Sequence, residues 1–275
     1  MRKKCHICPH SCDIEEGQTG FCGARDNING KIVCNNYGKL TSIALDPIEK
    51  KPLSRFMPNS YILSVGSYGC NLRCPFCQNH TISMANKTNA QTMAISVERL
   101  IQKALELKQE GNVGIAYTYN EPLIGYEFVF DCAKAAKQAG LINALVTNCY
   151  INQKPLLDIL PYIDAMNIDL KSFYNDFYKK LKGDADTVKR NIALAYHKCH
   201  VEITTLIIPG ENDSEKEMEE LSQWLSGLSP DIPLHISRFF PRYGYSHKRP
   251  TPAHTIYRLR DIAKQRLKYV YTGNC

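Results

Sequence analysis

An alternation of short apolar runs with amphipathic stretches, from residue 61 onward, constrains the fold of this chain more than any other feature. The apolar runs are rich in β-branched, aromatic and leucine residues, as buried strands are. Six of them follow one another: Tyr61–Val65, Val113–Tyr117, Ala144–Thr147, Ala165–Asp169, Val201–Ile207 and Pro233–Ser237. Helical patterns lie between or after them, at Ser96–Gln109, Tyr126–Ala139, Val188–His197, Glu215–Leu225 and Ile256–Leu267. This rhythm predicts consecutive βα units and a parallel sheet.

Six βα units are too few for a closed eight-stranded barrel, so we expect an α/β fold that is either an open, partial barrel or a doubly wound sheet. In both architectures ligands bind at the carboxyl ends of the strands, and residues just after each strand are the candidate functional residues. We expect helices to end at Gly111, Gly140 and Gly227, and Asn79 to cap the start of a helix.

A loop with three cysteines follows the first predicted strand. In Ser67–His80, SYGCNLRCPFCQNH, the residues Cys70, Cys74 and Cys77 have the spacing C-x3-C-x2-C. Structural zinc sites and ordinary iron–sulfur clusters use four protein ligands, so three thiolates leave one metal position open for a substrate or water. The alternative interpretation is a zinc loop that takes His80 as its fourth ligand.

This loop resembles the cluster loop of the radical SAM superfamily. The likeness rests on the cysteine spacing, on aromatic Phe76 before the last cysteine, and on the position after the first strand of a βα chain. The resemblance implies a partial (β/α)6 TIM barrel in which Cys70, Cys74 and Cys77 are the catalytic residues and ligands of a [4Fe–4S] cluster. S-adenosylmethionine would bind the open iron and be cleaved to a 5′-deoxyadenosyl radical, while the protein positions and shields this chemistry.

Longer stretches resemble the pyruvate formate-lyase activating enzymes and, within that group, the relatives called AmmeMemoRadiSam system enzymes. The stretches are DPIEKKPL at 46–53, the cysteine loop, YTYNEP at 117–122 and YTGN at 271–274. The activating enzymes imply a glycyl radical enzyme as partner and a flavodoxin- or ferredoxin-type electron donor. The second likeness permits a small molecule or another protein side chain as the substrate.

The resemblance also implies a set of residues around S-adenosylmethionine. Glu121 matches the acceptor of the cofactor's amino group, although Asn120 stands where a glycine is usual. Asp169 and Lys171 match an Asp-x-Lys motif, and alternation along an extended segment puts them on one face. Cys149 stands where the activating enzymes have glycine. The predicted set is Phe76, Asn120, Glu121, Thr147, Asn148, Asp169, Lys171, Ser237 and Arg238.

The first 58 residues lack the βα alternation and are rich in cysteine and glycine. Cys5, Cys8, Cys12 and Cys22 offer four thiolates within 18 residues, which could enclose one zinc ion or a second iron–sulfur cluster. Closely spaced cysteines in a cytosolic chain indicate metal binding rather than disulfide bonds. We therefore predict a metal-binding segment over residues 1–58 and a barrel over residues 59–275.

Charge and hydropathy set limits on the partners. The net charge is 34 − 27 = +7, which suits an acidic partner, a nucleic acid, or neither. A non-enzymatic zinc module for nucleic acid is a further alternative, but the chain has no aromatic-basic RNA motif, so we expect no nucleic-acid partner. The chain has no apolar run of about 18 residues and no signal-peptide pattern. We expect a cytoplasmic, oxygen-sensitive enzyme without a membrane partner.

Overall fold

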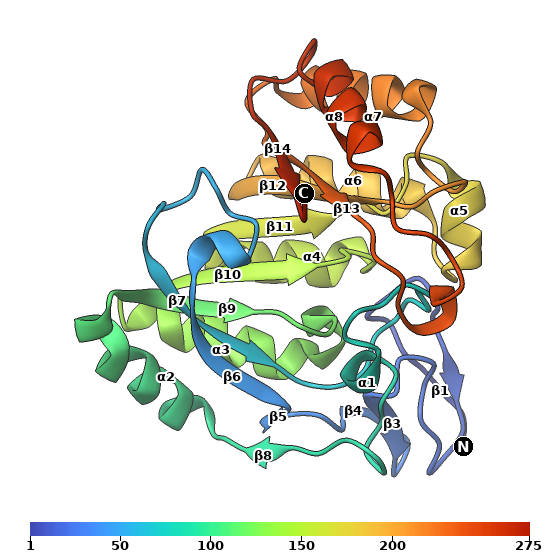
Figure 1. Ribbon diagram of the computed structural model, residues 1–275. Helices are drawn as coiled ribbons and strands as arrows, with labels where there is room; N and C mark the ends of the chain where they lie inside the picture. Colours follow the sequence, from blue (N-terminus) through green and yellow to red (C-terminus); the bar gives the residue numbers. More distant parts are fainter.

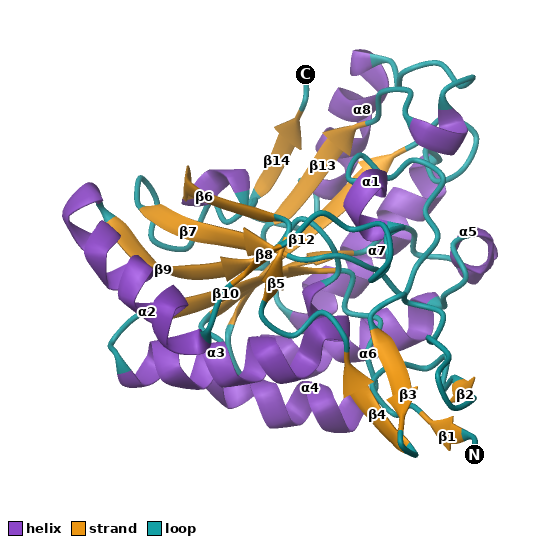
Figure 2. Ribbon diagram, turned by 90° about the horizontal axis from the view of Figure 1, so that it is seen from below, coloured by secondary structure: helices purple, strands orange, loops and turns teal.

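All six predicted strands are present, and they pair in the order in which the chain runs (Figures 1 and 2). They are parallel to one another: β7 (Tyr61–Gly66), β9 (Asn112–Tyr117), β10 (Ile142–Thr147), β11 (Ala165–Asp169), β12 (His200–Ile207) and β13 (Leu234–Arg238). The computed structural model describes residues 1–275. The strand order has no reversal of the kind that defines a doubly wound sheet, so the partial barrel is confirmed.

Two strands that the sequence pattern does not predict lie at the edges of the sheet. β6 (Ser42–Pro47) runs antiparallel to β7, and β14 (Val270–Gly273) runs parallel to β13. β6 ends in aspartate and proline, which are depleted in strands, and β14 is short, so neither has a strong strand signal. The two edges do not pair with each other, and the eight-stranded sheet remains open.

Helices cover the outer face of the sheet (Figure 2). The five predicted helices are α2 (Val97–Glu106), α3 (Tyr126–Gln138), α6 (Ala185–Tyr196), α7 (Glu215–Leu228) and α8 (Ala253–Ala263). Three shorter ones, whose few turns carry little periodic signal, are α1 (His80–Ser83), α4 (Gln153–Ile159) and α5 (Asn175–Lys180). Single 3-10 turns complete the chain at Ile48–Lys50, Leu107–Glu110, Pro122–Gly125, Leu160–Tyr162 and Tyr243–Tyr245. No helix combines the length and the apolarity that crossing a bilayer requires.

Two of the predicted glycine helix ends are confirmed. Gly111 and Gly140 adopt φ angles of +86° and +68°, as C-terminal helix caps do. The prediction for Gly227 is wrong, because α7 continues past it and a glycine inside a helix costs only about 1 kcal/mol. Asn79 precedes α1, but its side chain does not cap the helix. It donates instead to the carbonyl oxygen of Tyr119 at 2.7 Å.

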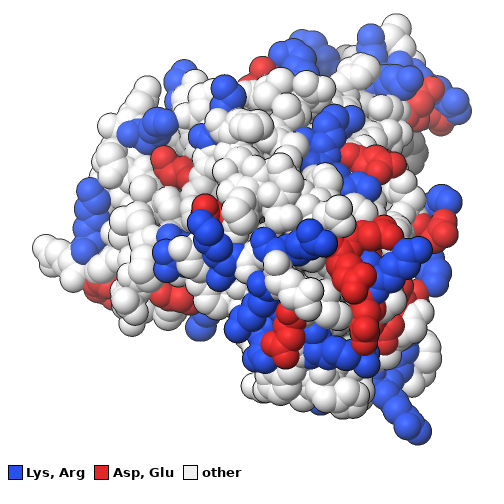
Figure 3. Space-filling view, turned by 90° about the horizontal axis from the view of Figure 1, so that it is seen from above, with Lys and Arg blue, Asp and Glu red and all other residues white.

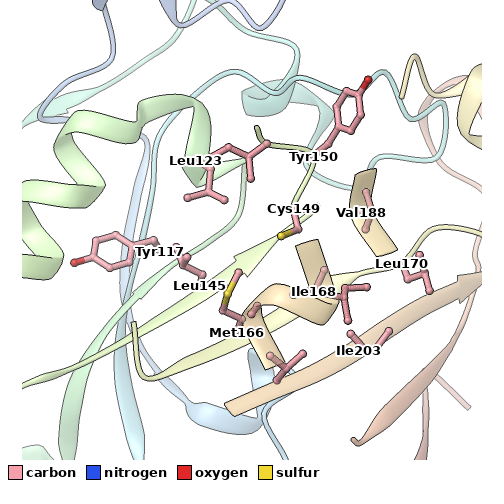
Figure 4. Close-up of a cluster of buried hydrophobic side chains, with 14 of the residues drawn as sticks. Tyr117, Leu123, Leu145, Cys149, Tyr150, Met166, Ile168, Leu170, Val188 and Ile203 are labelled. Carbon is pink, nitrogen blue, oxygen red and sulfur yellow. The ribbon is translucent and has the colours of Figure 1, made fainter. Parts of the chain in front are cut away.

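The two faces of the sheet bury different side chains. On the helix side, large residues such as Leu145, Met166 and Ile203 form the main core (Figure 4). Ala144 and Leu145 point to opposite faces, as neighbours on a strand do. The inner cluster consists of Ile48, Leu53, Ile62, Ala116, Ala144 and Ala165. Small alanines on three strands thus leave room inside the barrel for the loop after β6.

That loop, residues 48–56, lies inside the barrel near the amino ends of the strands. The buried carboxylate of Glu202 on β12 accepts hydrogen bonds from the backbone N–H groups of Ser54, at 3.0 Å, and Arg55, at 2.7 Å. The predicted boundary at residue 58 therefore falls after β6 and this loop, both of which are built into the barrel.

The residues before β6 form short hairpins beside the carboxyl ends of the barrel strands (Figure 1). β1 (Lys3–Lys4) pairs with β2 (Asp13–Ile14), and β3 (Arg25–Ile28) pairs with β4 (Lys31–Cys34). β5 (Lys39–Leu40) is not part of a hairpin and pairs with β8 (Met93–Ala94), which follows α1 in the chain. The local apolar cluster has only three residues, Cys22, Ala24 and Ile124. This segment buries little apolar surface of its own.

Candidate functional site

The three cysteines of the loop after β7 lie together at the carboxyl end of the barrel. Cys74 is buried, and Cys70 and Cys77 are partly exposed. Burial raises the pKa of Cys74 to about 12, with Lys171 acting to lower it and Cys77 to raise it. The pKa of Cys70 is also raised, by burial first and then by Glu121 and Cys74. Three thiols that influence one another's ionisation, with a lysine and a glutamate beside them, form one site.

Gly69 lets this loop lie against the amino-terminal segment. It adopts a φ of +88°, and a Cβ atom there would stand 2.5 Å from the carbonyl oxygen of Cys22, so a side chain would force the two backbones apart. The N–H of Cys70 donates to the same carbonyl at 3.1 Å. The backbone of Cys70 is thereby attached to the amino-terminal segment.

The surroundings of the Cys70 thiol suit an iron–sulfur cluster. The sulfur of Cys70 accepts from the N–H of Leu72 at 3.4 Å and from the Asn148 amide at 3.6 Å. Hydrogen bonds to sulfur tune iron–sulfur clusters, so these residues fit a cluster with three thiolate ligands.

His80 is not placed as a fourth ligand. Its ring stacks on that of Tyr243 with the centroids 4.5 Å apart. Its Nδ1 lies 3.3 Å from the carbonyl oxygen of Cys77. The geometry gives no support to a zinc loop completed by this histidine.

Glu121 is held just after β9 by three hydrogen bonds. Its Oε1 accepts from the hydroxyl of Thr147 at 2.7 Å and from the N–H of Leu123 at 3.0 Å, and its Oε2 accepts from the N–H of Asn148 at 2.8 Å. Burial raises the pKa of Glu121 to about 7, although these hydrogen bonds act to lower it. A carboxylate has about four acceptor positions, so one is left for a further donor.

Asn148 connects this network to the cysteine loop. Its amide donates to Oδ1 of Asn71 at 2.9 Å, and Asn71 donates to the carbonyl oxygen of Tyr150 at 2.6 Å. The next residue, Cys149, has a φ of +53°, in the region that favours glycine. This conformation matches the glycine that the family resemblance leads us to expect at that position.

Asp169 and Lys171 form an ion pair beside the thiols, on one face as predicted. Lys171 Nζ lies 2.8 Å from Asp169 Oδ2, and the two side chains are 15% and 30% exposed. Burial lowers the pKa of Lys171, but Asp169, Cys74 and Cys77 outweigh it, and the pKa is raised overall. The pair presents one cation and one anion, which can receive the carboxylate and the ammonium of an amino acid.

Phe76 and Asn120 make contacts that shape the loop. The ring of Phe76 packs on that of Phe177, with the centroids 5.9 Å apart. Asn120 accepts from the N–H of Ser67 at 3.0 Å and donates to the carbonyl oxygen of Gly69 at 3.1 Å. Asn120 thus fixes the chain just before Cys70, and a direct contact of either residue with a cofactor stays a prediction.

The side-chain contacts of Arg238 are with residues outside the predicted set. Its Nε donates to the carbonyl oxygen of Thr251 at 2.6 Å, and its guanidinium lies 4.8 Å from the ring centroid of Phe240, which is exposed. Ser237 shares a face of β13 with His235, whose ring hydrogen-bonds inside the barrel. Alternation therefore directs Ser237, but not Arg238, to the barrel interior.

The four amino-terminal cysteines also converge. Cys5, Cys8, Cys12 and Cys22 line one cavity together with Arg25. Burial raises the pKa of the Cys8 thiol to about 12 and that of the Cys22 thiol to about 11. The grouping predicted from their spacing is therefore present in the fold.

A buried ion pair that the sequence pattern does not reveal lies on the inner face of the barrel. Lys51 Nζ is 2.9 Å from Asp46 Oδ2 and 4.6 Å from the ring centroid of Tyr119, and the Tyr119 hydroxyl donates to the same carboxylate at 2.8 Å. Tyr119 has a φ of +72°, which is unusual for a bulky residue. The DPIEKKPL and YTYNEP segments meet here, and neither segment alone indicates that contact.

Known proteins are similar to this chain in sequence and in fold. The sequence profile of the Radical SAM superfamily matches residues 64–222. An uncharacterized protein of Methanocaldococcus jannaschii is 42% identical over 98% of this chain and 81% of its own length. A pyruvate formate-lyase-activating enzyme of Clostridium pasteurianum is 25% identical over 70% of this chain and 80% of its own. A radical SAM methyltransferase from Sphaerobacter thermophilus, 17% identical, has a similar fold over 79% of this chain and 67% of that protein, with a TM-score of 0.61.

Proposed function

This chain belongs to the radical SAM superfamily, and we propose that it is an activating enzyme that generates a glycyl radical on a partner protein. Cys70, Cys74 and Cys77 would hold a [4Fe–4S] cluster, which would supply the one-electron reduction that cleaves S-adenosylmethionine and so the means to remove a hydrogen atom from a glycine Cα. The observation that carries the proposal is that three thiols share one site with Glu121 and the pair of Asp169 and Lys171.

The residues of this chain would orient the amino-acid end of S-adenosylmethionine. Lys171 offers an ammonium to its carboxylate, and Asp169 and the free acceptor position of Glu121 offer oxygens to its ammonium. Charge-assisted hydrogen bonds are about twice as strong as neutral ones. Because Glu121 is buried and the ion pair largely so, water competes weakly for these contacts.

The open barrel supports a macromolecular partner. β6 and β14 leave the sheet unclosed, and an open sheet could admit the loop of another protein toward the carboxyl ends of the strands. On the face shown in Figure 3, lysine and arginine side chains are mixed with aspartate and glutamate and form no continuous basic stripe, which favours a protein over a nucleic acid. Relatives named as a pyruvate formate-lyase-activating enzyme and a putative glycyl-radical enzyme activating enzyme support a glycyl radical enzyme as the partner. A flavodoxin- or ferredoxin-type donor is what the family resemblance implies.

The cofactor chemistry is tested with wild type, Cys74→Ala and Cys275→Ala under anaerobic conditions. Cys275 is exposed and lies outside both cysteine groups, so its variant controls for the loss of a thiol. With dithionite and S-adenosylmethionine, we expect 5′-deoxyadenosine from the wild type and from Cys275→Ala, and only background from Cys74→Ala, because the cluster loses one of its three ligands. Undiminished product from Cys74→Ala would falsify the assignment.

The partner is tested in the same mixtures with purified pyruvate formate-lyase as the probe. We expect the wild type to produce a glycyl radical signal by electron paramagnetic resonance, and Cys74→Ala to produce none. Formation of 5′-deoxyadenosine without that signal would reject this partner. It would favour a small molecule or another protein side chain as the substrate.

A further inference from the structure

We infer that Cys5, Cys8, Cys12 and Cys22 hold a second [4Fe–4S] cluster, which passes electrons to the cluster at Cys70. The identity of this metal group is argued from the amino-terminal cysteines and their contacts and does not depend on the proposed function. Its role as an electron carrier rests on the proposed function, since it needs an acceptor cluster in the barrel.

The position of the four thiols favours a cluster over a zinc ion. All four line one cavity, and this cavity adjoins the barrel site, because the carbonyl of Cys22 accepts the N–H of Cys70. A zinc ion has no redox chemistry, whereas an iron–sulfur cluster here could exchange electrons with a cluster on the barrel thiols.

The spacing of these cysteines indicates which cluster. Cys5-x2-Cys8-x3-Cys12 repeats two of the three intervals of the C-x2-C-x2-C-x3-C run that binds [4Fe–4S] clusters, although the last cysteine of that run binds a neighbouring cluster. Sites for [2Fe–2S] clusters of the plant type begin with a longer C-x4-C interval. With Cys22 as the fourth ligand no iron stays open, which leaves electron transfer rather than substrate binding as the role.

Arg25 supplies an independent sign of an anionic group in this cavity. It lines the cavity with the four thiols, is only 4% exposed, and its Nε has no hydrogen-bond partner, one of two such buried side-chain atoms in the chain. Its other nitrogens are occupied: Nη1 lies 2.8 Å and Nη2 2.5 Å from the Glu127 carboxylate. A buried donor without a partner costs about 1 to 3 kcal/mol. Thiolates or cluster sulfides, which carry net negative charge, would satisfy Arg25 Nε.

His10 lines the same cavity but is not a candidate ligand. Its Nε2 lies 2.8 Å from the carbonyl oxygen of Asn71, and its ring packs on that of Phe21 with the centroids 4.4 Å apart. Both contacts fix the imidazole as part of the wall. The ligand set is therefore the four thiolates.

The position of the second site suits electron transfer to the first. The carbonyl of Cys22 accepts the N–H of Cys70, so residues that carry a ligand in each site are in direct contact. The carbonyl oxygen of Asn71, the residue after Cys70, also lies 2.8 Å from Nε2 of His10 in the cavity wall. One electron from a flavodoxin- or ferredoxin-type donor would reduce the second cluster from the 2+ to the 1+ state. Transfer of that electron to the barrel cluster would return it to 2+.

The first experiment counts metal in the Cys70→Ala/Cys74→Ala/Cys77→Ala variant, purified anaerobically, beside the wild type. We expect about four irons and four sulfides per chain in the variant, about eight of each in the wild type, and no stoichiometric zinc in either. One zinc per chain, or a variant without iron, would overturn the second cluster. Neither result bears on S-adenosylmethionine cleavage by the wild type, so the proposed function is judged separately.

The second experiment uses Arg25→Gln, with Arg25→Lys as the charge-conserving control. Loss of a nearby positive charge destabilises the reduced cluster, so Arg25→Gln should lower the reduction potential of one cluster signal and leave the other unchanged. Arg25→Lys should lie closer to the wild type. We also expect Arg25→Gln to slow reduction of the barrel cluster by flavodoxin more than fivefold, with normal 5′-deoxyadenosine formation under excess dithionite. Unshifted reduction potentials in Arg25→Gln would overturn the role given to Arg25. An unchanged rate of reduction by flavodoxin would overturn the electron transfer between the clusters.

Discussion

The two groups of cysteines differ in what holds them in place. The loop with Cys70, Cys74 and Cys77 follows a strand of the eight-stranded sheet and packs against a core of 51 buried residues. The amino-terminal four lie among two-stranded hairpins next to an apolar cluster of three residues. We therefore expect the barrel to form its site before metal binds, and the amino-terminal segment to depend for much of its order on the cluster proposed for its four thiols.

Metal removal should produce the largest difference in hydrogen-exchange protection between the two regions. After anaerobic treatment with an oxidant and a chelator, we expect amides of residues 1–35 to lose nearly all protection from hydrogen exchange, because metal binding contributes on the order of 10 kcal/mol to such small folds. Amides of β9 to β12 in the same sample are the control and should stay protected. Equal loss of protection in both regions, or loss in neither, would contradict the expectation that only the amino-terminal segment needs metal for its order.

Lys171→Met tests a residue that belongs to the barrel site alone. The substitution leaves Asp169 without its cation and removes the group assigned to the carboxylate of S-adenosylmethionine. We expect a 10- to 100-fold weaker affinity, about 1.4 to 2.7 kcal/mol, measured by equilibrium dialysis on the reconstituted protein. Iron bound by the amino-terminal four should not change.

The matched control is Lys154→Met, which breaks an exposed pair with Asp158 at 2.8 Å. Such surface pairs contribute about 0 to 1 kcal/mol. We therefore expect unchanged affinity for S-adenosylmethionine. A loss like that of Lys171→Met would mean that the effect is one of overall charge and not of position.

Asn71→Ala tests the contact between the two groups. Asn71 donates to Tyr150, accepts from Asn148, and lies beside the Cys8 thiol. Its removal leaves buried polar groups unpaired, so we expect a loss of about 1 to 3 kcal/mol in the free energy of unfolding and reduced iron in both sites. Asn79→Ala, which loses only a contact within the barrel site, should reduce barrel iron alone. Loss of iron from one site in Asn71→Ala would show that the two sites are independent.

The parts of the fold that the sequence predicts are those with strong periodic signals. Six strands and five helices have runs long enough to show the period of a strand or helix, and their order determines the open barrel. β14 and α5 are too short for that signal. The loop of residues 48–56 lies inside the barrel because alanines on three neighbouring strands make room for it. That complementarity belongs to tertiary packing and has no local pattern.

The candidate site shows the same division. Cysteine spacing groups Cys70, Cys74 and Cys77 correctly, since ligands on one short loop are necessarily near one another. The contact of Lys51 with Tyr119 joins segments nearly 70 residues apart, and no spacing rule describes it. Motif matching also does not say which face of a strand a residue occupies.

Arg238→Gln, for which we expect the smallest effect, tests that last point. The position after the sixth predicted strand and the family resemblance assign Arg238 to S-adenosylmethionine, whereas in the structure its Nε donates to Thr251 and its guanidinium stacks on exposed Phe240. We expect an affinity for S-adenosylmethionine within twofold of the wild type and a loss of about 0.5 to 1.5 kcal/mol in the free energy of unfolding. A tenfold weaker affinity with unchanged stability would return Arg238 to the site. It would also show that β13 turns its last residue toward the barrel interior when the cofactor binds.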